Sequence, residues 1–560
     1  MNLIGNINAI PFRRFRGGGG VTPFPSVPGM ITRYSALGLT NEQMAENPVW
    51  KDLTGNGHDL QMKNFAWGGM SGVGGYTENY NSNRWYKVVL RIDVTWTYKS
   101  FNARSIKENR SAQLFYQSLP SDTGFRVLSC TIKVSGLTDG QEIEYVSNGT
   151  QPTVIMRIEN DGIYHLPSFD FRAKNAYYGF KFLKLQESCN ITIEQLPLYP
   201  GALVFDGVDD YGVCENFPIL TKEKGYTVVA LRQWISMGEG ISGLVSNVKN
   251  WFNDGAFVLE YNSNNATNKF VNRPVSFGNV NIEMDLPNNF TYQTSKSYKG
   301  VPITTGSFKG TNSLFVGKLN NIIENCSNVA IWELVFLDHD ATEEELTKIK
   351  DYFVKTYPWL FPDQAWTVTG KTNEDEDRAT IANITGNGND LILSNFGFAE
   401  GSGYNEEGEY TGYLVTDGVD DKVQSSSFAM NEDWTIVGDW ELLSNVQINC
   451  GIVKAQNVYL YNIANGLLIS INNPRSLQSF GTKSLHAICS DGRLYDRNWV
   501  EYKYTADQNF EIVKSSLNIG FNLNNYAQIA FKNLGIYDNQ ILSKDDCIKA
   551  YNYLQTLKAK

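Results

Sequence analysis

The chain has 560 residues, with 48 Lys and Arg against 59 Asp and Glu, and its formal net charge at pH 7 is −11. Such an acidic chain argues against a nucleic-acid groove, which needs a basic face for phosphates. Aromatic residues make up 13% and charged residues only 19%, a composition typical of folded strands and tight turns rather than of disorder. Seven scattered Cys without a CxxC spacing and four dispersed His indicate neither a disulfide framework nor a metal motif, and we expect no cofactor.

Residues 1–29 stand apart from the rest of the chain. Their start lacks the basic segment and continuous apolar run of a signal peptide, and no part of the sequence approaches the ~20 apolar residues that span a membrane. Gly17–Gly20 and three prolines up to Pro28 form a linker that cannot bury a core. A basic and aromatic cluster precedes this linker: Phe12, Arg13, Arg14, Phe15 and Arg16. In an acidic chain this cluster predicts a peptide that docks on an acidic or apolar partner, the alternative being a tail with no partner.

Two parts of the chain repeat the same local signals in the same order. The string TGNG occurs at 54–57 and 385–388, and the string DGVDD occurs at 206–210 and 417–421. After a strand-rich stretch, each copy ends in an apolar strand and one helix. We interpret this pattern as a duplicated β-module.

The spacing between these strings locates an insertion. From Gly55 to Gly207 is 152 positions and from Gly386 to Gly418 is 32, so the first copy carries 120 extra residues, the length of a domain. The predicted organisation is an anchor peptide and linker at 1–29, a first sandwich at 30–76 plus 201–360, an inserted sandwich at 77–200 and a second sandwich at 361–560.

Local patterns within these segments predict strands and a few helices. In the insertion, alternating runs such as 127–134 and 154–158, separated by Asp-Gly turns, are typical of a small β-sandwich. A short helix is expected at 40–47, and longer helices at 342–353 and 543–554. Thr342 and Glu345 form a capping box at the start of the second helix. We expect each of the two longer helices to cover a sheet edge.

The repeated DGVDD string has two interpretations. In the first it is a tight turn at a strand end, where Gly207 and Gly418 take backbone angles closed to other residues and the aspartates accept hydrogen bonds from nearby amides. In the second it is a Ca²⁺ site, because clustered carboxylates supply hard oxygen ligands. We favour the turn and predict no metal. The carboxylates concerned are those of Asp206, Asp209, Asp210, Asp417, Asp420 and Asp421.

Catalytic and sugar-binding candidates are few. Glu283 and Asp285 alternate as a pair of catalytic carboxylates on one strand would, but Pro287 interrupts that strand and the second module has no counterpart. We therefore predict no catalytic residues. Aromatic rings stack on sugar rings, so the glycan candidates are Trp67, Trp85, Trp234 and Trp251, although most aromatic residues of a sandwich belong to its core.

The order of TGNG, then Ala202–Tyr211 with its DGVDD string, then a strand and one helix, resembles the concanavalin A-like lectin/glucanase superfamily. More narrowly, it looks like the laminin-G-like modules of bacteriophage and Bacteroidetes surface proteins. The second copy matches through Tyr413–Asp421. The resemblance implies an all-β fold: two jelly-roll sandwiches, the first interrupted by an immunoglobulin-like or carbohydrate-binding-module-like sandwich, each module ending in a short α-helix.

With the anchor peptide, the tandem modules are similar to virion appendage proteins of Bacteroides phages, including the crAss-like group. The expected protein is a non-enzymatic head or tail fibre component, assembled in the host cytoplasm. It would dock to capsid, portal or tail proteins through its N-terminus and adhere to host-surface polysaccharide, without nucleic acid or membrane insertion. A homotrimer is expected from the resemblance alone. The alternatives are a polysaccharide-degrading glycoside hydrolase and a structural decoration or adaptor protein that binds virion partners only.

Overall fold

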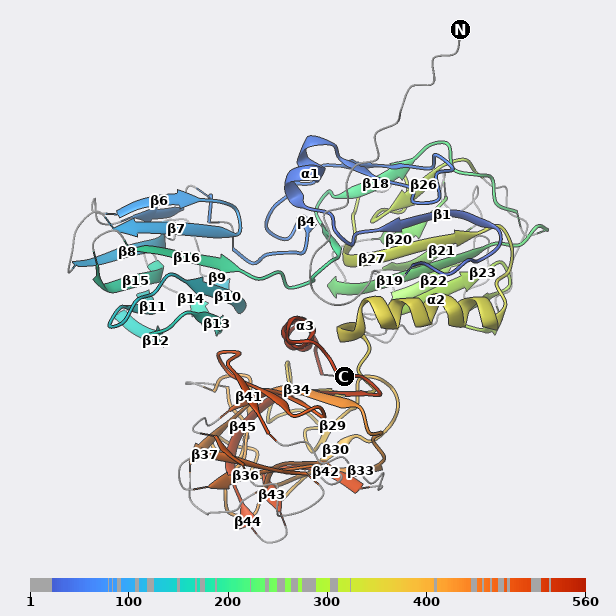
Figure 1. The fold of residues 1–560 in the computed structure, drawn as a ribbon. Helices are drawn as coiled ribbons and strands as arrows, with labels where there is room; N and C mark the ends of the chain where they lie inside the picture. Colours follow the sequence, from blue (N-terminus) through green and yellow to red (C-terminus); the bar gives the residue numbers. More distant parts are fainter. Residues whose placement is uncertain are drawn as a thin grey trace.

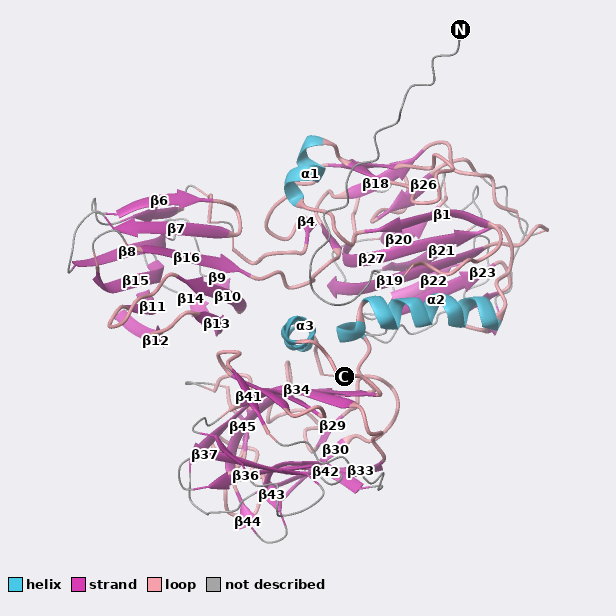
Figure 2. Ribbon diagram, in the orientation of Figure 1, coloured by secondary structure: helices cyan, strands magenta, loops and turns pink. Residues whose placement is uncertain are grey.

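The computed structural model is built of β-strands along the whole described chain, which confirms the all-β class (Figure 2). The strands of its large sheets pair antiparallel. The structure describes residues 23–559 except for 79, 83, 88–91, 106–109, 118–124, 149–151, 167–168, 172–176, 187–188, 222, 237–240, 249–256, 263–269, 274–288, 303–310, 323, 407–409, 445–450, 456–457, 464–465, 472–477, 481–483, 505–514 and 523–524. No helix within these ranges is both long and apolar enough to cross a membrane.

The first sandwich packs an eight-stranded sheet on a seven-stranded sheet. The eight-stranded sheet has the order β25-β24-β23-β19-β27-β17-β4, with β1 also paired to β27. Its strands are β1 Met30–Ser35, β4 Gly72–Val73, β17 Leu203–Asp206, β19 Thr227–Ser236, β23 Phe290–Thr294, β24 Ser297–Tyr298, β25 Val301–Pro302 and β27 Asn328–Leu337. The seven-stranded sheet comprises, in spatial order, β2 Val49–Trp50, β3 Leu60–Lys63, β18 Tyr211–Cys214, β26 Leu314–Val316, β20 Ser242–Ser246, β21 Val258–Asn262 and β22 Phe270–Arg273. Alternation along β3, where Leu60 and Met62 are buried between exposed neighbours, shows why these segments form the faces of a sandwich.

Strands β5 to β16 pair only with one another among the described residues. They form two five-stranded sheets, with the orders β13-β10-β16-β7-β6 and β12-β11-β15-β8-β5, and the ribbon β14-β9. The strands are β5 Trp85–Lys87, β6 Ile92–Trp96, β7 Ser100–Ser105, β8 Arg110–Gln117, β9 Phe125–Val127, β10 Cys130–Ser135, β11 Glu142–Asn148, β12 Pro152–Ile158, β13 Gly162–Leu166, β14 Phe169–Phe171, β15 Tyr177–Leu185 and β16 Asn190–Gln195. These strands enclose a core of their own.

The second sandwich repeats the arrangement of the first. Strand β28 joins β45 as β1 joins β27, and β34 pairs with β45 as β19 pairs with β27. One eight-stranded sheet contains β28 Gln364–Thr367, β31 Gly403–Tyr404, β32 Leu414–Val415, β34 Trp434–Ser444, β39 Leu485–Cys489, β40 Arg493–Asp496, β41 Glu501–Lys503 and β45 Gln528–Asp538. The facing sheet contains β29 Thr380–Ile381, β30 Leu391–Ser394, β33 Lys422–Phe428, β35 Gly451–Ala455, β36 Val458–Ile463, β37 Gly466–Ile471, β38 Gln478–Phe480 and β42 Ser515–Ile519, beside the ribbon of β43 Phe521–Asn522 and β44 Asn525–Tyr526.

The described chain contains the three expected helices and one short 3₁₀ turn. These are α1 Asn41–Glu46, α2 Glu343–Thr356, η1 Pro358–Leu360 and α3 Lys544–Gln555. The capping box of α2 is confirmed, because Thr342 accepts from the Glu345 N–H and the Glu345 side chain accepts from the Thr342 N–H. The expectation that the longer helices cover sheet edges is wrong for α3, which contacts β34 and β45 inside the sheet order. Its apolar side chains face the broad outer surface of that sheet, which offers more area to bury than an edge does.

Helix α3 lies where the three lobes meet (Figure 1). Its Tyr551 and Leu554 share one buried cluster with side chains of the first sandwich, of α2 and of the segment that leads out of the insertion. Hydrogen bonds join the same lobes: Thr131 of the insertion donates to Asn552 at 2.6 Å, and Gln233 of β19 donates to Thr556 at 2.9 Å. The lobes are therefore packed on one another through the C-terminal helix.

The end of the expected linker packs against the first sandwich. The Phe24 ring lies 4.8 Å from the Tyr352 ring, and the Arg33 guanidinium lies over the Phe24 ring at 4.2 Å. Val27 is buried in the same cluster as α2. These contacts fix the chain at Phe24 and Val27 beside α2.

Candidate functional site

The first DGVDD string forms a closed turn between β17 and β18. The Asp206 Oδ1 accepts from the Val208 N–H at 2.8 Å, and the two carboxylate oxygens of Asp210 accept from the Asp206 N–H at 3.1 Å and from the Ser71 hydroxyl at 3.0 Å. Gly207 has φ +80°, and a Cβ there would come within 2.7 Å of an Asn328 side-chain atom. The predicted left-handed glycine is confirmed.

The second string repeats this hydrogen-bond pattern. Asp417 Oδ1 accepts from the Val419 N–H at 2.8 Å, and Asp421 accepts from the Asp417 N–H at 2.8 Å and from the Ser402 hydroxyl at 3.1 Å. Gly418 has φ +74°. The two turns thus share one internal hydrogen-bond scheme.

In each turn the three carboxylates lie close enough to hold a metal ion, with oxygens within 4.8 Å of one another. Burial, helped by the Asp206 carboxylate, raises the pKa of Asp210 to about 7. Burial likewise raises the pKa of Asp421 to about 6. The third members, Asp209 and Asp420, are exposed. The oxygens of Asp210 and Asp421 accept hydrogen bonds from a backbone N–H within each turn and from the hydroxyls of Ser71 and Ser402 outside it, so protein donors close both turns.

The three glycan-candidate tryptophans within the described ranges lie in different surroundings. Trp85 is 6% exposed in the core of the insertion, and Trp234 is 4% exposed inside the first sandwich, where its indole donates to a buried carboxylate at 3.0 Å. Trp67 is half-buried and stacks on the Phe65 ring at 4.7 Å. Trp251 lies outside the described residues.

Two other sets of candidates also fall outside the described ranges. These are the docking cluster, Phe12 to Arg16, and the carboxylate pair, Glu283 and Asp285.

A cavity of about 480 Å³ lies between the two repeated sandwiches. This volume is within the range of about 300–1,000 Å³ that small-molecule sites occupy. Five segments line the cavity: the start of β23, the turn after β24, helix α2, the connector 360–363 with the second TGNG turn, and the C-terminal part of the chain around α3. The lining residues include Asn289, Phe290, Tyr292, Lys299, Lys350, Asp363, Gln540 and Tyr553.

Two amide oxygens at the cavity have no hydrogen-bond partner among the described residues. The Asn289 side chain is 4% exposed, and its Nδ2 donates to the Leu360 carbonyl at 2.8 Å and to the Tyr553 hydroxyl at 2.9 Å. Because a carbonyl can only accept, this bond assigns the amino group and leaves Asn289 Oδ1 as an unused acceptor. The second amide oxygen without a partner is the buried Gln540 Oε1. Both oxygens are closed to solvent, so a molecule in the cavity does not reach them unless the side chains move.

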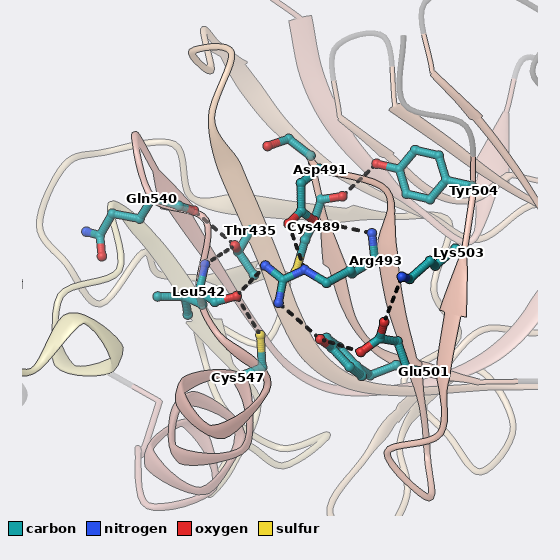
Figure 3. A network of polar contacts seen from close by, with 12 residues as sticks. Thr435, Cys489, Asp491, Arg493, Glu501, Lys503, Tyr504, Gln540, Leu542 and Cys547 are labelled. Carbon is teal, nitrogen blue, oxygen red and sulfur yellow. Dashed lines mark hydrogen bonds and ion pairs between the residues drawn. The ribbon is translucent and has the colours of Figure 1, made fainter. Parts of the chain in front are cut away.

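A polar network holds the chain at Gln540 in place (Figure 3). The Thr435 hydroxyl donates to the Gln540 carbonyl at 2.9 Å and accepts from the Leu542 N–H at 2.9 Å. The Arg493 guanidinium donates to the Leu542 carbonyl at 3.0 Å and to the Asp491 carboxylate at 2.7 Å. The sheet of the second sandwich thereby fixes the segment that enters α3 and lines the cavity.

Aromatic and charged side chains complete the cavity. Phe290 and Tyr292, on β23, are both partly exposed, and their ring centroids are 5.9 Å apart. Asp363 accepts from the Asp538 N–H at 2.7 Å. Burial raises the pKa of Asp363 to about 6, although this hydrogen bond lowers it.

No motif of the sequence marks these cavity residues. They come from segments hundreds of positions apart, and the only local signal was the proline-bounded connector around Pro362 followed by the second TGNG turn. Recognising the junction between repeats as a place where ligands bind would have pointed to this region.

No protein-family model and no curated protein matches the sequence. Among solved structures, the chain is similar to Trypanosoma rangeli sialidase in complex with sialic acid, with a TM-score of 0.25 and 8% identity over 82% of this chain and 83% of that one. It is also similar to the binding domain of botulinum neurotoxin serotype D, with a TM-score of 0.23 and 10% identity over 61% of this chain and 88% of that one. At these values the likenesses carry no argument about activity or ligand.

Proposed function

We propose that this chain is a non-enzymatic surface protein of a bacteriophage virion and that the cavity between its two sandwiches binds a host-surface glycan. The observation that supports glycan binding is the cavity itself, which is lined by two partly exposed aromatic residues, Phe290 and Tyr292. Sugar rings present apolar faces that pack on aromatic side chains. The aromatic lining and the volume of the cavity support a saccharide site.

An array of bacterial surface polysaccharides tests this proposal. Wild-type protein should bind some of them, and Tyr292→Ala should abolish that binding by removing a stacking surface. Trp67→Ala provides the control, because Trp67 is a half-buried aromatic residue outside the cavity. If binding persists in Tyr292→Ala and is lost in Trp67→Ala, the site lies elsewhere. A blank array with wild-type protein would favour an adaptor that binds virion proteins only.

Docking through the N-terminus is the second part of the proposal. Deleting residues 1–22 removes the cluster Phe12 to Arg16 but keeps Phe24 and Val27, which pack on the first sandwich. The truncated protein should fold and bind glycan but fail to enter particles. Normal incorporation would refute docking by this peptide.

The absence of hydrolysis is the third part. Incubation with a bound capsular polysaccharide should release no new reducing ends. Release that Glu283→Gln abolishes would replace the proposal with a glycoside hydrolase.

A further inference from the structure

We infer that the insertion carries a second saccharide site, on the outer face of the sheet β12-β11-β15-β8-β5, with Tyr86 and Tyr177 as its stacking residues. The ligand class is a saccharide chain without net charge. This site is separate from the cavity and goes beyond the proposed function, so either site can stand without the other.

The strand register places both tyrosines on the outer face of this sheet. Their chain neighbours Trp85 and Tyr178 belong to the buried core of the insertion. Successive side chains of a strand point to opposite faces, so Tyr86 and Tyr177 point away from that core. Phe115 of β8 lies directly opposite Tyr86 and therefore shares its face.

The three rings form one aromatic layer. The Tyr177 ring stacks on the Phe115 ring with the centroids 4.3 Å apart, and Phe115 is only 3% exposed. Burial raises the pKa of Tyr86, and the nearby Tyr177 raises it further, so the two tyrosines are neighbours. Both tyrosines are partly exposed. A tyrosine ring offers an apolar surface and a polar tip, which suit the apolar face and the hydroxyls of a sugar ring.

The charged side chains beside these rings neutralise one another. Lys181 lies four residues after Tyr177 on β15, and hence on the same face. Glu144 pairs with Lys181 at 3.0 Å and with Arg157 at 3.2 Å, and Arg157 also pairs with Glu142 at 3.5 Å. Two cations thus stand with two carboxylates. A charged ligand finds no net attraction here, which favours a neutral saccharide.

The apolar area of this face fits a sugar better than a protein partner. Val146 and Val154 continue the row of Phe115 across the sheet, and they are 7% and 42% exposed. A specific protein interface buries about 800 Å² on each partner, whereas a sugar ring covers about one aromatic side chain. The ring contacts and ion pairs of the described residues on this face all stay within the insertion.

Saturation-transfer NMR on the full-length protein tests this inference in the Tyr292→Ala background, where the cavity has lost a stacking residue. The probes are cellohexaose, maltohexaose and laminarihexaose, which are neutral, and hexagalacturonate, which is anionic. Short probes are needed because a long polysaccharide on an array can engage both sites at once, so that loss of one abolishes retention. At least one neutral probe should bind, with little dependence on salt. Tighter binding of hexagalacturonate would overturn the neutral class.

Variants of the two tyrosines complete the test. In the same background, Tyr177→Ala and Tyr86→Ala should each weaken binding at least about fivefold, whereas Tyr177→Phe should keep it because the ring remains. Tyr211→Ala is the matched control, because Tyr211 is a partly exposed tyrosine of the first sandwich, and it should change nothing.

Two outcomes would refute the second site. If the Tyr292→Ala protein binds no probe, or if binding survives the loss of both Tyr86 and Tyr177, the insertion has no such site and the cavity proposal still stands. If analytical ultracentrifugation shows a dimer that Tyr86→Ala dissociates, the face binds a second copy of the chain instead of a saccharide.

Discussion

At the scale of single residues, the most constrained side chains form a buried ion pair inside the first sandwich. The Arg232 guanidinium donates twice to the Glu260 carboxylate, at 2.6 Å from each nitrogen. The hydroxyls of Thr291 and Tyr298 donate to the same carboxylate at 2.5 and 2.8 Å. Burial would raise the pKa of Glu260, but the Arg232 charge and these bonds lower it to about 2.

The second sandwich shows that the fold does not need this ion pair. Strands β19 and β34 shift register against their neighbours at the same place, between Leu231 and Arg232 in one and between Asp439 and Trp440 in the other. Trp440, which is 3% exposed, therefore takes the place of Arg232. The second sandwich therefore has an apolar ring at the position where the first has a hydrogen-bonded ion pair. This exchange is expected if buried ion pairs contribute little net stability.

Removing one partner should nevertheless be costly. Glu260→Gln leaves the buried Arg232 without a counter-charge, and we expect the free energy of unfolding of the first sandwich to fall by about 3–5 kcal/mol in urea titrations at pH 7. Glu344→Gln is the control, because Glu344 pairs with Lys348 at 2.6 Å on the exposed side of α2, in the same module, and its loss should change the free energy of unfolding far less. Equal costs would show that the buried pair is not specially dependent on its charge.

At the scale of elements, the DGVDD turns make a prediction about metal and pH. If the turns close through their own hydrogen bonds, the melting temperature should be the same in EGTA and in millimolar Ca²⁺. The pKa of Asp210 is about 7 and that of Asp421 about 6, both above the unfolded value, so folding takes up protons. Stability should therefore fall as pH rises from about 4 through 7. Ca²⁺ that raises the melting temperature and abolishes this fall would establish a metal site.

Sequence patterns predicted what local interactions determine. The α2 start was predictable because Thr342 and Glu345 satisfy each other within four residues. The turn at Gly207 was predictable because few residues tolerate its backbone angles. The packing of α3 on β34 and β45 was not predictable from the sequence. Ile548 and Leu554 show that one face of the helix is apolar, but they do not show which surface that face covers. The cavity could not be predicted from the sequence either, because it forms only when separate lobes pack together.

At the scale of the whole molecule, the contact between the insertion and the second sandwich buries ionisable groups. His165 of β13 hydrogen-bonds Thr131 at 3.3 Å, and its ring lies 5.5 Å from the Tyr551 ring of α3. His486 of β39 stacks on the same Tyr551 ring, with the ring centroids 4.3 Å apart. One ring nitrogen of each histidine is buried without a partner among the described residues.

The charges around these histidines come from several elements. Lys532 of β45 and the buried Asp439 of β34 act on His165, and Asp439 and Arg497 act on His486. The Tyr413 hydroxyl and the Gln555 amide donate to Asp439, at 2.9 and 2.8 Å. Both bonds end on Oδ2 of Asp439, whose negative charge favours protonated histidines but is outweighed by burial.

Acid should therefore separate the insertion from the second sandwich. Burial lowers the pKa of His165 to about 3 and that of His486 to about 4, so both are neutral while the lobes are docked. A base whose pKa is depressed in the docked state favours undocking once pH falls below its free value of about 6.5. We expect the radius of gyration from solution scattering to rise between pH 6.5 and 4, before the sandwiches unfold. In His165→Gln this rise should move to lower pH, whereas His58→Gln, a change in the TGNG turn of the first sandwich, should leave it in place. A radius that stays constant until global unfolding would show that packing around α3 outweighs the protonation of both histidines.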